Sequence, residues 1–142
     1  MADNDLPAGK TFDLPLAVSF KHCDPAGMVF YPRYVEMLND VIEAWFDQGL
    51  GCSYQALHVQ RGLAIPTVSL NCDFRRPSRL GDRLLAQLDV ERLGASSVSL
   101  WHRLSDRDDP ADIRLTARQV IVFIDSATTR PIPVPPDILT PM

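Results

Sequence analysis

The sequence predicts an α+β fold in which an antiparallel sheet folds around one long helix. Apolar residues recur at helical spacing in a single segment, residues 34–46. Four runs of strand type follow, joined by short turns and with no second helical pattern. One helix followed by consecutive strands is typical of an antiparallel sheet packed on a helix. A chain of 142 residues, 46% of them hydrophobic, suits a single domain over residues 1–142.

The N-terminal half is predicted to hold one strand, one turn and the helix. We expect the first strand at Leu14–Lys21. The segment Asp24–Gly27 has Asp first, Pro second and Gly fourth, which is the preference of a type I turn. Pro32 suits the first position of a helix, which should end near Gln48, before two glycines. The apolar face of this helix is predicted to carry Tyr34, Val35, Leu38, Val41, Ile42, Trp45 and Phe46.

The C-terminal half is predicted to consist of strands and a proline-rich tail. The strands are expected at Ala64–Phe74, Asp82–Arg92, Ser96–Leu104 and Ile113–Ile124. Residues 93–95 are typical of a hairpin break, and Ser105–Asp112, with four Asp and one Pro, should be a solvated turn. Five prolines lie within residues 131–141, so the final segment should be extended rather than helical and should pack as a tail.

Composition and charge exclude several classes of function. The net charge of −4 and the lack of a basic stripe with aromatic residues argue against a nucleic-acid partner. No apolar run approaches the ~18 residues that span a membrane, and the first ten residues lack the features of a signal peptide, so we expect a cytoplasmic protein. Three widely spaced cysteines favour reduced thiols over disulfides. The spacing of His22, His58 and His102 predicts no metal site.

The segment His22–Tyr34 concentrates the residues that could perform chemistry. Asp24 places a carboxylate shortly before the start of the helix, although an Asp-Pro pair can serve only to shape a turn. The first N–H groups of a helix have no intrahelical acceptor and can polarise a carbonyl or hold an oxyanion. Cys23 is expected to be a small buried residue whose side chain points away from that of Asp24, because neighbours alternate in an extended segment.

These thirteen residues, His-Cys-Asp-Pro-Ala-Gly-Met-Val-Phe-Tyr-Pro-Arg-Tyr, resemble the signature of hotdog-fold thioesterases of the 4-hydroxybenzoyl-CoA thioesterase type. A second block, Pro66–Phe74 followed by Pro77 and Leu80-Gly81-Asp82, is similar to the next strand of that family and the turn after it. The likeness spans roughly Ala17 to Pro135. It implies a hotdog fold, in which a five-stranded antiparallel sheet wraps around one long helix. It also implies a homodimer or homotetramer with active sites at a subunit interface.

The resemblance further implies a set of site residues. Asp24 would act as the nucleophile on the thioester carbon or as the general base on water, and the backbone N–H of Tyr31 would bind the thioester oxygen. Arginine suits the phosphates of CoA, and Arg75, Arg76 and Arg79 cluster beside a strand end, where they could also form only a solvated basic edge. Arg130 falls where the family carries a nucleotide-contacting Arg. No cofactor is implied, because coenzyme A is part of the substrate.

The predicted function is hydrolysis of an acyl-CoA thioester, with an aromatic acyl group of the hydroxybenzoyl kind. Two differences from that branch bear on the substrate: Gly94-Ala95-Ser96 stands where basic residues meet CoA, and Asn39 stands at an otherwise acidic helix position. One alternative is hydrolysis of short-chain or fatty acyl-CoA, although those relatives typically have Asp-x-Gly-Gly and Tyr-His. The other alternative is a non-catalytic protein that binds CoA esters.

Overall fold

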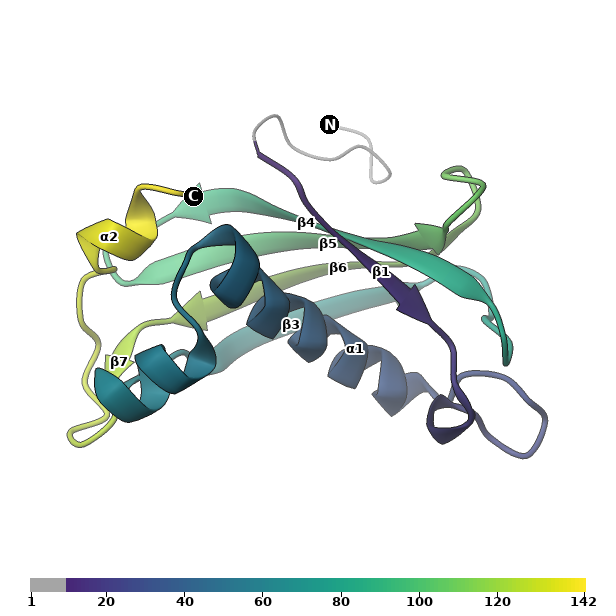
Figure 1. Ribbon diagram of the computed structural model, residues 1–142, viewed down its shortest axis with the longest axis horizontal. Coiled ribbons are helices and arrows are strands. Elements are labelled where there is room, and N and C mark those ends of the chain that lie inside the picture. The colour runs from purple at the N-terminus through teal and green to yellow at the C-terminus, as the bar shows by residue number, and fades with distance from the viewer. Residues whose placement is uncertain (1–9) are drawn as a thin grey trace.

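A five-stranded antiparallel sheet covers one side of the main helix in the computed structural model, which describes residues 10–142 (Figure 1). The strand order is β1-β4-β5-β6-β3. The strands are β1 (Phe12–Ala17), β3 (Thr67–Phe74), β4 (Arg83–Leu93), β5 (Ser97–Asp106) and β6 (Ile113–Val122). The predicted α+β class, with five antiparallel strands around one helix, is therefore confirmed.

The helix α1 (Tyr31–Ala44) buries one face against the sheet and continues as a π-helical segment, η2 (Trp45–Gly49). Its buried residues repeat every three or four positions, as the sequence predicted, and pack on apolar residues of β4, β5 and β6. Val35 is an exception, because it lies at the margin of the stripe and is 38% exposed. Met37, which was not predicted, is buried in its place.

Two of the predicted strands are each divided in two. Ile65-Pro66 separates β2 (Leu63–Ala64) from β3, since proline cannot donate a ladder hydrogen bond. A break after Val122 separates β6 from β7 (Ile124–Asp125), which pairs with β2 in a small second sheet. The expected turn 105–112 is shorter than predicted, because β5 extends to Asp106 and Ser105 is buried.

The helices outside α1 differ most from expectation. Beyond Ala17 the chain forms a 3-10 turn, η1 (Phe20–His22), where the first strand was predicted to continue. A second helical segment, η3 (Gln55–Gln60), was not predicted because it is short and has no repeating apolar stripe. The tail packs as expected, since Val134 and Ile138 are buried, but it includes a one-turn helix, α2 (Pro136–Leu139). Proline is compatible with the first turn of a helix, so the prediction of an extended tail was wrong there.

The edge strand β3 is the most exposed strand of the large sheet. It pairs with β6 on one side, and no other strand among residues 10–142 pairs with its second side. Val68 is 61% exposed and Phe74 is 51% exposed on this strand. An exposed apolar edge strand is a surface on which another strand can pair. None of the helices within residues 10–142 has the length and apolar character needed to cross a membrane.

Candidate active site

Asp24 sits in a tight turn that fixes one of its carboxylate oxygens. The N–H of Gly27 donates to the Asp24 carbonyl at 3.0 Å, and Gly27 has a φ of 78°, a conformation that favours glycine. The side-chain oxygen Oδ1 accepts the N–H of Ala26 at 2.9 Å and that of Met28 at 3.2 Å. The second oxygen, Oδ2, accepts no hydrogen bond from the described residues. The turn therefore orients the carboxylate and leaves one oxygen available for chemistry.

The loop that carries Asp24 forms a short two-stranded ribbon from His22 to Phe30, directly before α1. The N–H of Phe30 donates to the His22 carbonyl at 3.0 Å, and Cys23 and Val29 form a bridge. The His22 ring accepts the N–H of Ser19 at 2.9 Å through Nδ1. Burial, followed by the charge of Lys21, holds the pKa of His22 below its ordinary value of 6.5. His22 is thus a neutral ring that anchors the base of the loop.

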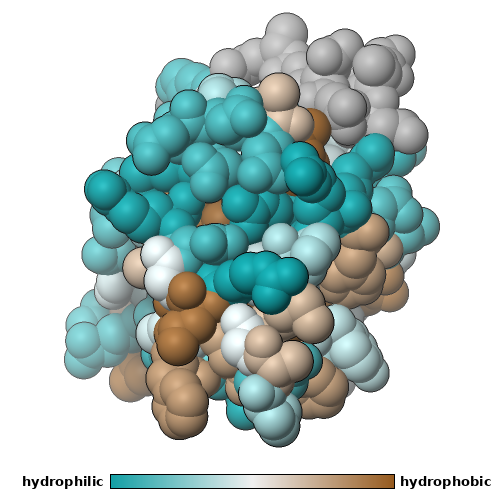
Figure 2. Space-filling model, turned by 90° about the vertical axis from the view of Figure 1, so that its right-hand side faces the viewer, coloured by the Kyte–Doolittle hydropathy of each residue, from teal (hydrophilic) through white to brown (hydrophobic). Residues whose placement is uncertain are grey.

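A hollow beside Asp24 is lined mainly by apolar residues, which are Phe20, Cys23, Pro25 and Leu80. The prediction that Cys23 and Asp24 do not share a pocket was therefore wrong, because Asp24 opens a tight turn directly after the extended Cys23. Cys23 is half-buried, and its thiol lies 3.5 Å from the Ser19 carbonyl. Figure 2 views this end of the molecule and shows hydrophobic residues gathered in its lower part.

Tyr31 begins α1 and offers a backbone N–H that no described residue accepts. In the same turn, the Phe30 N–H is taken by His22, the Arg33 N–H donates to the Phe30 carbonyl at 2.8 Å, and Pro32 has no N–H. The start of a 14-residue helix also carries the positive end of its dipole. A carbonyl oxygen or an oxyanion could bind at this N–H.

The structure brings Tyr31, Arg75 and Arg76 together. All three line one hollow, together with Val29, Tyr34, Phe74 and Pro77. The ring centroids of Tyr31 and Phe74 lie 6.3 Å apart, so the wall of the hollow is aromatic. The Arg75 guanidinium contacts the Thr116 hydroxyl at 3.3 Å, and Arg76 pairs with Asp112 at 3.3 Å with its side chain 66% exposed. Asp24 lines the separate hollow described above.

Arg130 lies apart from the other predicted site residues. It follows β7 in an exposed turn, whose Thr129 has a φ of 59°. This turn lies at the opposite end of the sheet from the Asp24 loop (Figure 1). A single chain therefore does not bring Arg130 to Asp24 or Tyr31.

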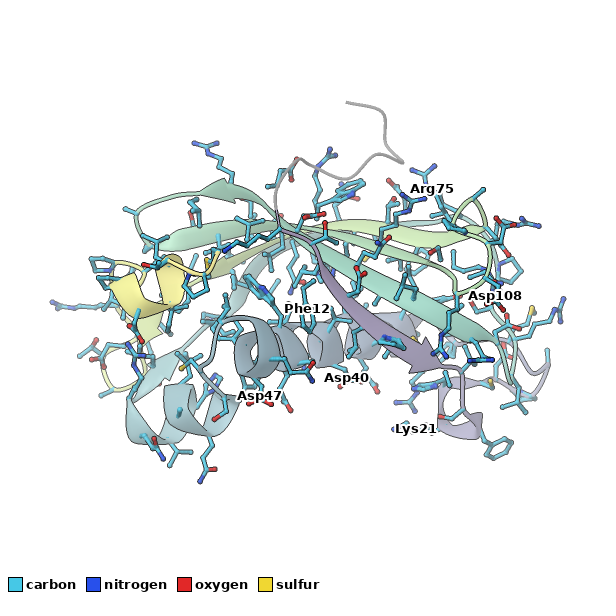
Figure 3. All side chains as sticks on the ribbon, turned by 45° about the horizontal axis from the view of Figure 1, so that its top comes forward. Phe12, Lys21, Asp40, Asp47, Arg75 and Asp108 are labelled. Atoms are coloured by element: carbon cyan, nitrogen blue, oxygen red, sulfur yellow. The ribbon has the colours of Figure 1, made fainter. Side chains whose placement is uncertain are left out.

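Several carboxylates lie together on the outer face of α1. Asp40 and Asp47 lie on the side of α1 that is turned away from the sheet, whereas Arg75 projects at the far side (Figure 3). Glu43 lies near both aspartates, and the three carboxylates line one hollow. No cluster of three or more His, Cys, Asp or Glu within residues 10–142 could hold a metal ion. An anionic ligand would therefore favour the arginine side over the outer face of α1.

Sequence reasoning missed a buried ion cluster next to the Asp24 loop. Arg114 is 7% exposed and donates to Asp82 at 2.7 Å, to Asp112 at 3.0 Å and to Asp106 at 3.3 Å. Asp106 and Asp112 were predicted to be solvated turn residues. The one signal in the sequence was a charged residue between two apolar ones in a strand, at Ile113-Arg114-Leu115.

Comparison with known proteins identifies the family. The sequence model of the Thioesterase-like superfamily matches residues 18–141. The chain belongs to this superfamily. The resemblance found in the sequence is therefore confirmed, as are the hotdog fold and the expectation of a thioester hydrolase.

Individual relatives agree over most of the chain. A 1,4-dihydroxy-2-naphthoyl-CoA hydrolase of Synechococcus elongatus is 29% identical over 119 residues, covering 83% of this chain and 85% of the relative. The crystal structure of a 1,4-dihydroxy-2-naphthoyl-CoA thioesterase from Synechocystis has a TM-score of 0.84 at 26% identity, covering 93% of this chain and 95% of that one. An Asp-to-Asn mutant of 4-hydroxybenzoyl CoA thioesterase, complexed with 4-hydroxybenzoyl CoA, has a TM-score of 0.82 at 25% identity, covering 94% and 99%.

Proposed function

We propose that this protein hydrolyses an aromatic acyl-CoA thioester, with Asp24 as its catalytic carboxylate and Tyr31 as its oxyanion donor. The observation that carries the proposal is that one short ribbon carries an open carboxylate oxygen in its turn and ends at an open N–H of the helix start. Oδ2 of Asp24 is held in place by its turn yet accepts no hydrogen bond from residues 10–142, and the N–H of Tyr31 is the unpaired donor of the first helical turn.

The chemistry follows from the two groups. When Oδ2 attacks the thioester carbon, the carbonyl oxygen gains charge and the Tyr31 N–H stabilises it. Collapse of this intermediate breaks the carbon–sulfur bond, releases the thiolate of CoA and leaves a mixed anhydride that water hydrolyses to the free acid. In the alternative route, the same carboxylate takes a proton from water, which then attacks the thioester carbon. Both routes need Asp24 ionised and oriented.

A homodimer that pairs two β3 strands would complete the site. Pairing two copies of one edge strand about a two-fold axis is antiparallel, so Thr67 of one protomer lies beside Phe74 of the other. The exposed edge and apolar side chains of β3 support this arrangement. The β2–β7 sheet adjoins the Thr67 end, so the turn that holds Arg130 would approach the other protomer's Tyr31 hollow.

Arg75 and Arg76 of one protomer, with Arg130 of the other, are the proposed contacts for the CoA phosphates. Arginine meets phosphate with a fork of N–H donors. Arg76 is mostly exposed and Arg130 is exposed, so both can reach a ligand in solution. The carboxylates on the outer face of α1 would repel the same phosphates and so favour this path for the nucleotide.

The aromatic acyl group is the finer part of the proposal. The relatives are named for hydroxylated aromatic acyl groups, with one ring in hydroxybenzoyl and two in dihydroxynaphthoyl. Rings of Phe30, Tyr31 and Phe74 lie exposed around the helix start, where the acyl group would enter. Aromatic side chains pack on aromatic ligands in offset or edge-to-face geometry.

Free-thiol release from a matched panel of CoA esters tests the proposal. The panel contains 4-hydroxybenzoyl-CoA, 1,4-dihydroxy-2-naphthoyl-CoA, a short-chain ester and a long-chain ester, each at several concentrations. We expect kcat/KM to be highest for an aromatic ester, and the ratio between the one-ring and two-ring esters reports the depth of the pocket. A preference for an aliphatic ester would contradict the aromatic assignment. Tight binding of esters without thiol release would instead support a non-catalytic binding protein.

A further inference from the structure

The buried Ser78 makes hydrogen bonds to three parts of the molecule. Its hydroxyl accepts a hydrogen bond from the Tyr34 hydroxyl at 2.9 Å and one from Nη1 of Arg114 at 3.1 Å. Its backbone carbonyl accepts the N–H of Val29 at 2.9 Å. Ser78 is completely buried, so water does not compete for these contacts. One residue thus joins the helix α1, the strand β6 and the Asp24 loop.

Neighbouring backbone contacts fasten the Asp24 loop to the same segment. The N–H of Leu80 donates to the Gly27 carbonyl at 3.0 Å, and Met28 and Arg79 form a bridge. Gly27 and Met28 belong to the turn that holds Oδ1 of Asp24. The position of segment 77–82 therefore determines the position of the Asp24 carboxylate.

Arg114 fixes segment 77–82 from the other side. Its guanidinium bonds the Pro77 carbonyl at 3.3 Å, the Ser78 hydroxyl and the Asp82 carboxylate. Burial alone would lower the pKa of Arg114, but hydrogen bonds to Asp112 and Asp82 outweigh it and raise that pKa, so the group keeps its charge. The planar fork of arginine holds several acceptors in fixed directions, which a flexible lysine cannot do.

We propose that Ser78, held by Arg114, is a positioning residue that sets the separation between the Asp24 carboxylate and the Tyr31 N–H. The inference rests on the proposed function. Tyr34 lies one turn into α1, so its hydroxyl ties the helix start to Ser78, while Val29 and Leu80 tie the loop to the same segment. Catalysis is sensitive to such geometry, since a displacement of about 1 Å can cost on the order of 100-fold in rate.

Three variants and one control test the proposal by kinetics. Tyr34→Phe removes one hydroxyl and keeps the buried ring, Ser78→Ala removes the shared acceptor, and the third variant combines both changes. Tyr54→Phe is the matched control, because it deletes the hydroxyl of a partly buried tyrosine that precedes η3 and lies beside the C-terminal end of α1, away from the Asp24 loop. We expect kcat to fall roughly 10- to 100-fold in each single variant, with KM within about twofold. The double variant should be no slower than the slower single variant, because both changes break the same link.

Three different results would contradict the proposed role of Ser78. A lower melting temperature with unchanged kcat would assign Ser78 a purely structural role. Losses in kcat that multiply in the double variant would show that Tyr34 and Ser78 act independently. Equal losses in Tyr54→Phe would show that the effect is not specific to this link.

Amide hydrogen exchange separates this inference from the proposed function. The N–H groups of Met28 and Val29 should exchange faster in Ser78→Ala than in the wild type and in Tyr54→Phe, because segment 77–82, whose Ser78 carbonyl accepts the Val29 N–H, loses its hydrogen bonds to Tyr34 and Arg114. Unchanged exchange would overturn the positioning role even in an active enzyme. If the wild type cleaves no ester, the proposed function fails, while the exchange rates still decide whether Ser78 holds the loop.

Discussion

Replacement of His102 by Gln should remove about 2 kcal/mol of the unfolding free energy that the protein loses between neutral and mildly acidic pH. His102 lies on β5, is 1% exposed, and makes a hydrogen bond of 2.8 Å through Nε2 to the side-chain oxygen of Gln119. Burial lowers the pKa of His102 from 6.5 to about 4, against the opposing effect of the bond with Gln119. The folded protein therefore keeps this ring neutral at a pH where the unfolded chain protonates it.

The sign and size follow from proton linkage. Because the pKa of His102 is lower in the folded state, the unfolded state binds more protons between pH 6.5 and about pH 4, so stability falls as the pH falls through that window. With these two pKa values, His102 alone should cost about 2 kcal/mol of unfolding free energy between about pH 7.5 and about pH 5. That is a large fraction of the 5–15 kcal/mol typical of a whole domain.

Urea unfolding at a series of pH values measures this effect in the wild type and in His102→Gln at one protein concentration. Gln is uncharged at every pH in the series, and its amide can still donate to Gln119. We expect the variant to be less stable at neutral pH through imperfect packing. Between the same two pH values, however, its unfolding free energy should change by about 2 kcal/mol less than that of the wild type. Parallel curves for the two proteins would refute the reasoning, because they would show that the burial of His102 is not linked to protons.

Three further predictions concern the ion cluster, the edge strand and CoA binding. Partial burial alone would raise the pKa of Asp82, but hydrogen bonds from the Arg79 N–H and the Arg114 guanidinium outweigh it and lower that pKa below 3.8. The Asp82 carboxylate should therefore stabilise the fold above pH 3.8 and lose this effect as the pH falls further. Asp82→Asn should thus be less stable at neutral pH, and its melting temperature should fall less than that of the wild type as the pH is lowered into the acid range. An equally steep fall in melting temperature would contradict the assignment. If the protein forms the proposed β3-paired dimer, Val68→Lys should convert it to monomers in sedimentation velocity, because a charge on the β3 edge blocks strand pairing, whereas Val59→Lys on η3 should not. Arg130→Ala should raise KM for an acyl-CoA ester and leave kcat unchanged, so a loss confined to kcat would argue against a phosphate contact.

The sequence was sufficient to predict the main elements, because their burial is periodic. The stripe of α1 repeats every three or four residues, and burial alternates over Arg83–Leu88 of β4 and Ala117–Val122 of β6, so each pattern identifies its own element. The Asp24–Gly27 turn was also predictable, since its residue types match the turn and Gly27 adopts the positive φ that glycine allows. These features depend on residues that are close in the sequence.

Features that depend on distant residues could not be predicted in the same way. Arg114 meets Asp82 and Ser78 from more than thirty positions away, so no local spacing reveals their cluster. The short segments η3 and α2 are held by contacts such as the ion pair of Arg61 with Asp137 at 2.8 Å, which joins them. Nor could spacing show that Asp24 uses one oxygen for its own turn. The chemistry of the site depends on these details.

The most direct test of the central claim compares the wild type with Asp24→Asn on the aromatic ester that the wild type cleaves fastest. Asn keeps the shape of Asp and an acceptor oxygen for the N–H groups of Ala26 and Met28, but it can neither attack a thioester nor take a proton. Thiol release under single-turnover conditions and calorimetric binding of the same ester should be measured on one preparation. The expected result is loss of nearly all thiol release with ester binding retained. Turnover close to that of the wild type would show that Asp24 is not the catalytic carboxylate.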